Sequence, residues 1–541
     1  MASPHHAIKR RIIRSIPSLQ HEHKSYKWWV LCNVMIGTFI AVLDATIVNV
    51  GFSKIMASLG ATLDSIEWIM TGYNLSLGVM LPASGWIADH LGYKKTYFLA
   101  LSIFTAGSAL CGFSWNESSL ISFRIIQGLG AGMLMPVGLA IVMREFPKEQ
   151  RGMAMGFWGI AAAASISFGP LVGGYLVDNF SWQAIFFVNL PIGLIGLFVT
   201  LIIQREYKTE NTRDFDFLGF LSITAFLTAT LLGLSEGNAV WNTGGWTSPF
   251  IVGCFTVGIT SHIVFLIVES YQEHPFIEIK LFKNYNFTAS NAIIFIFGIG
   301  MFGSTFLMPL YWQNALGYTA IMAGSMFLPV GIIQAFASPI SGVISDKISP
   351  KLPAVTGVIL LTISLLLNSH LTLETEKPFM YMLLSIRGLA MGLIFTPLTT
   401  VSLLEIPSHK MAQASGLINV IRQIGGSFGI AIFGSILSRR TAFHAATFGQ
   451  AINQASPIFK NTYGAVAGHL THNFNSAGSV ANSQAGALIL SNLQKQAFVQ
   501  AINDDFLIAA AITIIIIIPI LFLRTAKKKA QADAADHIAI E

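Results

Sequence analysis

The stretch WVLCNVMIGTFIAVLDATIVNVGF, residues 29–52, contains a single charged side chain, that of Asp44. At 1.5 Å per residue, about 20 apolar residues in a helix cross the roughly 30 Å hydrocarbon core of a bilayer. The stretch therefore predicts a membrane-spanning helix, with Asp44 about 22 Å from its first residue. A charge at that depth costs at least about 2.5–3.5 kcal/mol on insertion scales, so it is retained where it faces a cavity or a partner.

Similar apolar stretches recur along the chain. Hydrophobic residues make up 53% and charged residues only 11% of the 541 residues, whereas about 25% of an ordinary soluble protein is charged. This composition excludes a water-soluble fold. We expect fourteen spans, near residues 29–52, 66–88, 95–113, 118–142, 153–178, 183–203, 216–236, 249–269, 288–312, 321–344, 353–371, 379–401, 412–437 and 506–523.

The distribution of basic residues favours an even number of spans. With both termini in the cytoplasm, 23 of the 32 Lys and Arg residues lie on the cytoplasmic side, three in spans and six outside. This asymmetry follows the positive-inside rule. Losing or adding one span would move Lys527 to Lys529 outside, so thirteen spans fit poorly, whereas twelve are left open. Because the basic residues lie in loops, the net charge of +6 predicts no nucleic-acid partner.

The chain also contains an internal repeat, typical of transporters built from two related halves. Residues 85–90 (GWIADH) return 257 positions later as residues 342–347 (GVISDK), and Gly128 returns 260 positions later as Gly388. Six spans fit in each half, with two between them. We therefore divide the chain into a cytoplasmic tail (1–27), a six-helix bundle (28–203), a linker with two inserted spans (204–284), a second six-helix bundle (285–525) that includes an external loop (439–505), and a second cytoplasmic tail (526–541).

Other classes of site are not predicted. Cys32, Cys111 and Cys254 fall within spans, without metal-ligand spacing, and we interpret them as packing residues. The first apolar stretch is a full-length span without a following cleavage site, so it is not a secretory signal. The sequence contains no Walker loop, metalloprotease motif or Gly-rich nucleotide fingerprint. We expect neither an enzyme nor a cofactor, and the energy source we expect is a proton gradient.

Four charged residues lie well inside predicted spans, away from the span ends, namely Asp44, Arg124, Arg387 and Arg422. Desolvation favours the neutral form of a carboxyl group and a nearby arginine favours its charged form, so a movement that changes either can load or release a proton. We predict that Asp44, Arg124 and Arg422 couple transport to protons. The alternative for Asp44 is a static ion pair that locks two helices, and for Arg124 it is the capping of backbone carbonyls.

Three motifs carry a family resemblance: residues 43–50 (LDATIVNV), 85–95 (GWIADHLGYKK) and 415–427 (SGLINVIRQIGGS). In this order they resemble those of the major facilitator superfamily, specifically its fourteen-span drug:proton antiporters of the EmrB and QacA type. The resemblance extends from about residue 29 to residue 523. It implies an all-α membrane fold of two six-helix bundles plus two inserted helices, and it implies efflux of drugs.

The resemblance also implies roles for two further groups of residues. Residues 85–95 correspond to a cytoplasmic gate, in which His90 and Tyr93 stand where the family usually has Arg, so we expect a weaker charge network there. The gate residues are Gly85, Asp89, Gly92, Lys94, Lys95 and, across the repeat, Asp346. The fifth span resembles the antiporter signature, on which the direction of transport rests, through Gly156, Gly169, Pro170, Gly173 and Gly174.

The expected function is proton-coupled export of hydrophobic or cationic compounds across the cytoplasmic (inner) membrane by alternating access. A substrate cavity is expected at Thr46, Asn49, Trp68, Tyr73, Gln127, Arg387 and Gln423. The alternative is an uptake symporter for an organic anion or peptide-like nutrient, clamped by Arg124 and Arg422, because one fold can host both directions. By resemblance, a periplasmic adaptor and an outer-membrane channel are expected as partners if the source is Gram-negative.

Overall fold

The computed structural model describes residues 25–524, except residues 62, 208–215, 240, 273–274, 408–409, 452–455 and 475–477. Every regular element in this part of the chain is a helix, which confirms the predicted all-helical class. The C-terminal tail 526–541 lies outside the described residues, and so does all but the last three residues of the N-terminal tail 1–27.

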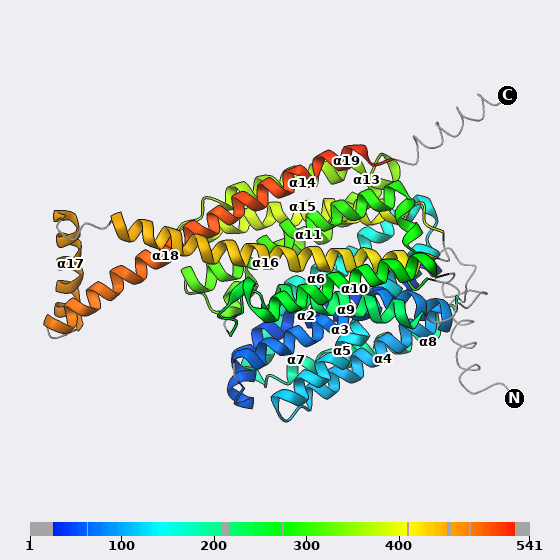
Figure 1. Ribbon diagram of the computed structural model, residues 1–541, viewed down its shortest axis with the longest axis horizontal. Coiled ribbons are helices and arrows are strands. Elements are labelled where there is room, and N and C mark those ends of the chain that lie inside the picture. Colours follow the sequence, from blue (N-terminus) through cyan, green and yellow to red (C-terminus); the bar gives the residue numbers. More distant parts are fainter. Residues whose placement is uncertain are drawn as a thin grey trace.

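The first half of the chain forms one group of helices (Figure 1). Its elements are α2 (Tyr26–Leu59), α3 (Leu63–Leu91), α4 (Tyr93–Gly112), α5 (Glu117–Glu145), the short η2 (Lys148–Gln150), α6 (Arg151–Asn179), α7 (Ala184–Phe187) and α8 (Asn189–Ile203). Side-chain capping marks the start of α5. At the start of α5, the Asn116 side chain accepts the Ser119 N–H at 2.7 Å while the Ser119 hydroxyl accepts the Asn116 N–H at 3.1 Å, a reciprocal capping box.

Two inserted helices follow, and then the second half. The inserted part comprises α9 (Phe217–Glu236), η3 (Gly245–Thr247) and α10 (Pro249–Tyr271), and α9 packs on α3 and α16. The second half comprises η4 (Ile279–Lys283), α11 (Tyr285–Leu310), η5 (Tyr311–Ala315), α12 (Ala320–Ser325), α13 (Leu328–Lys347), α14 (Lys351–Asn368), α15 (Lys377–Leu403), α16 (Met411–Ala451), α17 (Pro457–Phe474), α18 (Gly478–Ile515) and α19 (Ile517–Phe522).

Within the described residues, twelve helical segments are long and apolar enough to cross a membrane. The helices α3 and α4, at the second and third predicted spans, are not among these twelve, although both pack against α5 in the bundle. The count of fourteen therefore stays a prediction, as does the cytoplasmic location of the termini.

The two ends of the bundle differ. The first described helix, α2, begins on the side where the last helices end (Figure 1). There the Tyr26 hydroxyl donates to the Ile203 carbonyl at 2.7 Å, and the Asn286 amide donates to the Arg524 carbonyl at 2.9 Å. We call this side, which is predicted to be cytoplasmic, the terminal end. We call the opposite side, where α17 lies, the hairpin end.

The predicted external loop 439–505 is largely helical. The helices α16 and α18 continue beyond the bundle at the hairpin end, and α17 packs on α18 (Figure 1). Where the two long helices leave the bundle, Asp504 pairs with Arg440 at 2.6 Å and with His444 at 2.7 Å. A segment rich in Asn, Gln, Ser, Ala and His is compatible with an exposed helix as well as with a loop, so its fold could not be predicted from the sequence.

Candidate functional site

A buried ion pair lies at the centre of the first bundle. Asp44, in the middle of α2, accepts a hydrogen bond at 2.5 Å from Arg124, in the first half of α5, and neither side chain is exposed at all. An ion pair between Asp44 and an arginine was the alternative left open for Asp44 in the sequence analysis, and the structure contains such a pair. Removing one member of such a pair leaves an uncompensated buried charge, which costs about 3–5 kcal/mol.

A second residue of α5 and two further helices, α8 and α4, contribute to the surroundings of Asp44. Its second carboxylate oxygen accepts the Gln127 amide at 2.8 Å and the Asn189 amide, from the start of α8, at 3.0 Å. Asn189 also donates to the hydroxyl of Ser108 in α4 at 3.1 Å. Sequence analysis did not predict Asn189 or Ser108 as site residues, although Asn189 lies within residues 187–193 (FVNLPIG), a further stretch that resembles the family.

Arg124 has partners other than the carboxylate. It donates to the Gln127 carbonyl oxygen at 2.8 Å and contacts the backbone oxygen of Ile69 at 3.5 Å. Its guanidinium also lies 3.9 Å from the centre of the Tyr73 ring in α3, within range of a cation–π interaction. The predicted cavity residues Tyr73 and Gln127 thus belong to the shell of the ion pair.

The other two membrane arginines lie elsewhere. Arg422 in α16 is partly exposed, bonds Asn419 and stands 5.1 Å from the ring centre of Phe395, without an ion-pair partner among the described residues. Arg387 in α15 is buried and donates to α11 through the Met301 carbonyl and the Ser304 hydroxyl, both at 3.0 Å. The structure therefore brings Asp44 and Arg124 together and leaves the other two arginines in the second half.

A cavity of about 430 Å³ lies between α3, α9, α11 and α16. We call it the α3–α16 cavity. Its polar wall includes Asn74 of α3 and Gln423 and Ser427 of α16, and Phe306 contributes an aromatic ring. Of the residues predicted to bind substrate, Gln423 alone is among the residues described as lining it.

The remaining predicted cavity residues are dispersed. Thr46 bonds the Leu43 carbonyl at 2.9 Å where α2 meets α6. Trp68, near the start of α3, is exposed on the surface. Asn49 lies in α2, and its side chain is outside the described residues.

The predicted gate at residues 85–95 contains a hydrogen-bonded chain. The Tyr93 hydroxyl donates to Asp89 at 3.1 Å and accepts from Arg144 at 3.1 Å, with the Arg144 guanidinium 3.9 Å from the Tyr93 ring centre. Tyr93 thus links an acid and a base although it replaces the Arg usual in the family. The gate thus contains a hydrogen-bonded network that includes Tyr93 in place of Arg, and the expected weakness of its charge network stays a prediction.

The turn from α3 to α4 requires glycine and binds the linker. Gly92 has φ +95°, a conformation that residues with a side chain rarely adopt. Glu206 accepts the backbone N–H of Lys94 at 3.1 Å, and the Lys94 ammonium donates to the Leu201 carbonyl at 2.7 Å, whereas Lys95 is exposed. Burial raises the pKa of Glu206, and the Lys94 hydrogen bond and Lys95 oppose this shift.

Asp346 joins the two halves at the terminal end. Its carboxylate accepts the N–H of Gly152 at 2.9 Å and that of Met153 at 2.8 Å, in the first turn of α6. The residue that precedes α6, Gln150, provides no side-chain cap. An acid from the second half therefore caps a helix of the first, where the helix dipole favours negative charge.

Replacing Asp346 by Ala is expected to weaken this contact by about 0.5–2 kcal/mol, because two N–H groups lose their acceptor. Distances between spin labels at the terminal ends of α6 and α13 should then include a larger separated population. Asp346→Asn keeps one acceptor oxygen and is expected to have a smaller effect. Equal distance distributions in all three proteins would contradict this role.

The same end is closed between α3 and α16 as well. A Cβ added to the predicted gate residue Gly85 would lie 3.0 Å from the backbone of Gln413, and one added to Gly416 would lie 2.8 Å from the Leu81 carbonyl. Farther toward the hairpin end, the α3–α16 cavity separates the two helices. The helices α3 and α16, one from each half, are therefore in close contact at the terminal end and are separated by the cavity farther toward the hairpin end.

The helix α6 has small residues on two faces. Gly169 and Gly173 allow contact with α2, since an added Cβ would lie 2.1 Å from Thr46 Oγ1 and 2.7 Å from Ile47 Cγ1, respectively. On the face toward the second half, Gly156 abuts Ser338, Pro170 abuts Gly324 and Gly174 abuts Ile321. All five predicted residues of this signature thus permit close helix packing, three of them between the halves.

Comparisons with known proteins agree with this architecture. The sequence model of the family described as the Major Facilitator Superfamily matches residues 34–430 of this chain. The uncharacterised transporter YhcA of Bacillus subtilis is 29% identical over 92% of this chain and 93% of its own, and the multidrug export protein EmrB of Haemophilus influenzae is 30% identical over 88% and 91%. The crystal structure of the human organic anion transporter MFSD10 covers 90% of this chain and 99% of its own, with a TM-score of 0.57 and 12% identity, and supports the fold alone.

Proposed function

Because the chain belongs to the major facilitator superfamily, we propose that it exports lipophilic or cationic compounds in exchange for protons. Its family, together with the twelve apolar helical segments among the described residues, indicates a multi-pass membrane transporter rather than an enzyme. Multidrug export proteins among its relatives support efflux as the direction of transport.

The main observation that supports the proposed proton coupling is the environment of Arg124. If Asp44 takes up a proton, its attraction for the guanidinium falls, and a buried cation without partners would be too costly to keep. Arg124 retains the Gln127 oxygen at 2.8 Å and the face of the Tyr73 ring at 3.9 Å. These partners do not depend on the charge of Asp44, so the shell is suited to both protonation states.

The proposed cycle is alternating access. The terminal end is closed by the Asp346 cap and by the contacts of Gly85 and Gly416, whereas the α3–α16 cavity lies beyond them. Protonation of Asp44 from outside would loosen α2 from α5, and rearrangement of the halves would then expose the cavity to the other side. Release of the proton inside would restore the ion pair.

The location and partners are part of the same proposal. We place the chain in the cytoplasmic membrane, with the terminal end inside. In a Gram-negative source, a periplasmic adaptor and an outer-membrane channel would extend the export path.

Everted membrane vesicles test the direction and the coupling together. With the membrane potential clamped at zero and the lumen acidified by one pH unit, one-for-one exchange is expected to concentrate a lipophilic cation about tenfold in the lumen. Vesicles without the protein and vesicles treated with a protonophore are the controls. Depletion of the cation from the lumen under the same gradient would instead support the uptake symporter.

A further inference from the structure

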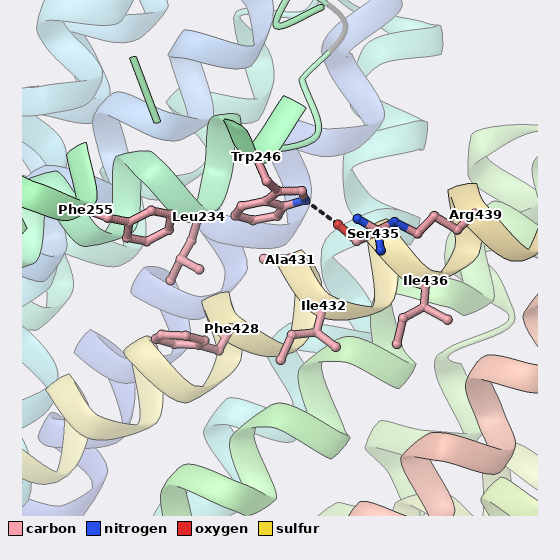
Figure 2. Close-up of a pocket in the computed structure, with 9 residues that line it drawn as sticks. All are labelled: Leu234, Trp246, Phe255, Phe428, Ala431, Ile432, Ser435, Ile436 and Arg439. Atoms are coloured by element: carbon pink, nitrogen blue, oxygen red, sulfur yellow. Dashed lines mark hydrogen bonds between the residues drawn. The ribbon is translucent and has the colours of Figure 1, made fainter. Parts of the chain in front are cut away.

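The inserted helices form a second hollow against α16, which we call the lateral groove. Its volume is about 360 Å³. Its lining residues are Leu234 of α9, Trp246 of η3, Phe255 of α10, and Phe428, Ala431, Ile432, Ser435, Ile436 and Arg439 of α16 (Figure 2).

The lateral groove is apolar along its length and cationic at one end. Figure 2 shows the rings of Phe255 and Phe428 at one end, and Ser435 and the Arg439 guanidinium at the other. Phe428 and Arg439 lie on the same helix, 11 residues apart, which corresponds to about 16 Å. A ligand that matches this pattern has one apolar chain and an anionic head.

The Arg439 guanidinium in the groove is accessible to an anionic ligand. Arg439 is exposed and has no ion-pair partner among the described residues, whereas its neighbour Arg440 is paired with Asp504 at 2.6 Å. The Ser435 hydroxyl beside it donates to Asn238 at 2.9 Å and accepts from Trp246. These bonds attach the inserted helices to α16, so the polar end of the groove is a formed structure.

The groove adjoins both the bilayer and the α3–α16 cavity. Ile432 on its wall is exposed, as are Val252 and Val257 on the outer surface of α10, a pattern typical of a lipid-facing surface. On the inner side, Leu234 and Ala431 line both the groove and the cavity. Two apolar side chains thus separate a membrane-facing groove from a polar-lined cavity between the halves.

We propose that the lateral groove binds a single-chain anionic amphiphile as cargo, with its chain along Phe428 and Ile432 and its carboxylate at Arg439. The inference rests on the proposed export function, which it extends by naming a substrate class and a lateral path past Leu234 and Ala431. A site of this volume is at the low end of the range for small-molecule pockets, which favours one chain over the two of a phospholipid.

Photolabelling tests this site without a proton gradient, so its failure is distinguishable from failure of the export proposal. The purified full-length protein in phosphatidylcholine nanodiscs is exposed to dodecanoic acid that carries a diazirine near the chain end. Labelled peptides from α10 and from residues 428–436 are expected. Arg439→Gln is expected to reduce labelling about tenfold, because the carboxylate loses a charge-assisted hydrogen bond at the exposed end of the groove.

The neighbouring arginine provides a matched control. Arg440→Gln removes the same charge one residue away, outside the groove, and is expected to leave labelling unchanged, whereas Arg439→Lys should retain most of it. The corresponding diazirine alcohol, without a charge, should be insensitive to Arg439→Gln. Equal labelling of the Arg439→Gln and Arg440→Gln proteins would overturn the site, and loss of labelling on adding phosphatidylglycerol to the nanodiscs would assign it to a resident lipid instead of cargo.

Discussion

Replacing Asp44 by Asn is expected to lower pH-driven export in everted vesicles by at least about 100-fold, the lower range for loss of a positioned proton-transfer group. Asn has nearly the shape of Asp and can still accept hydrogen bonds from Gln127 and Asn189, but it does not take up a proton. The shape of the cavity lined by Gln423 should be unaffected, since that cavity lies between other helices. Substrate binding at fixed pH is therefore expected to persist while its dependence on pH disappears.

The single substitution also leaves Arg124 buried without a counter-ion, at a cost of about 3–5 kcal/mol. Loss of export in Asp44→Asn alone would not separate coupling from stability. The double variant Asp44→Asn with Arg124→Gln removes both charges, and neutral replacement of a buried pair is often close to neutral for stability. We expect this protein to fold with nearly native thermal stability and to lack proton-driven accumulation.

A peripheral ion pair provides the control for charge removal itself. Glu278 and Lys410 are 2.6 Å apart, and the Lys410 side chain is 23% exposed although Glu278 is buried. Water can therefore hydrate the lysine in Glu278→Gln, and this variant is expected to leave export unchanged. If the double variant folds and still accumulates the cation with native pH dependence, Asp44 is a static lock between α2 and α5, and the coupling proposal is wrong.

The position of Asp44 could be predicted because depth in a bilayer follows directly from helix rise. One acidic residue in a continuous apolar stretch has few compatible environments, and an arginine in another span is the simplest partner. Its amide partner Asn189 was not predictable in the same way. Asn189 begins α8, and which polar group in the shell it meets depends on how α8 packs against α4 and α2.

The arginines show the limit of a repeat in sequence. Arg387 corresponds to Gln127 across the repeat, yet Arg387 bonds carbonyl and hydroxyl oxygens of α11, whereas Gln127 donates to Asp44. The two bundles share helix packing without sharing side-chain chemistry. Equivalent positions therefore predicted close helix contacts better than they predicted a coupling or substrate role.

The lateral groove could not be predicted from the sequence, for a different reason. Its wall combines α9, η3, α10 and α16, which are separated by up to about 200 residues of chain. The apolar residues in each helix are also those expected of any lipid-facing surface. Only the packing of the inserted helices against α16 shows that some of them leave a hollow with Arg439 at its end.

Replacing Gly156 by Ala is expected to shift the equilibrium between conformations and to reduce export strongly. The added Cβ would lie 2.5 Å from the Ser338 carbonyl oxygen and 2.6 Å from the Cα of Pro339. Ordinary contacts between such atoms are about 3.5–4.0 Å, so α6 and α13 would have to separate by roughly 1 Å. Both obstructing atoms belong to the backbone of α13, so a change of side-chain rotamer does not relieve the clash.

Overpacking of this kind costs about 1–3 kcal/mol, which corresponds to a change of roughly 5- to 150-fold in the population with the halves in contact. Gly159→Ala is the matched control, because it adds the same methyl group on the same helix against the same Ser338. There the added Cβ would lie 3.2 Å from Ser338 Cβ and Oγ, so a much smaller shift relieves the contact. We expect Gly159→Ala to export at a near-native rate. Spin-label distances between α6 and α13 should lengthen in Gly156→Ala alone. The clash opposes only the conformation in which α6 and α13 touch. An equal loss of export in both variants would therefore show that α6 tolerates no added volume in any conformation. The close approach at Gly156 would then not control the exchange between conformations.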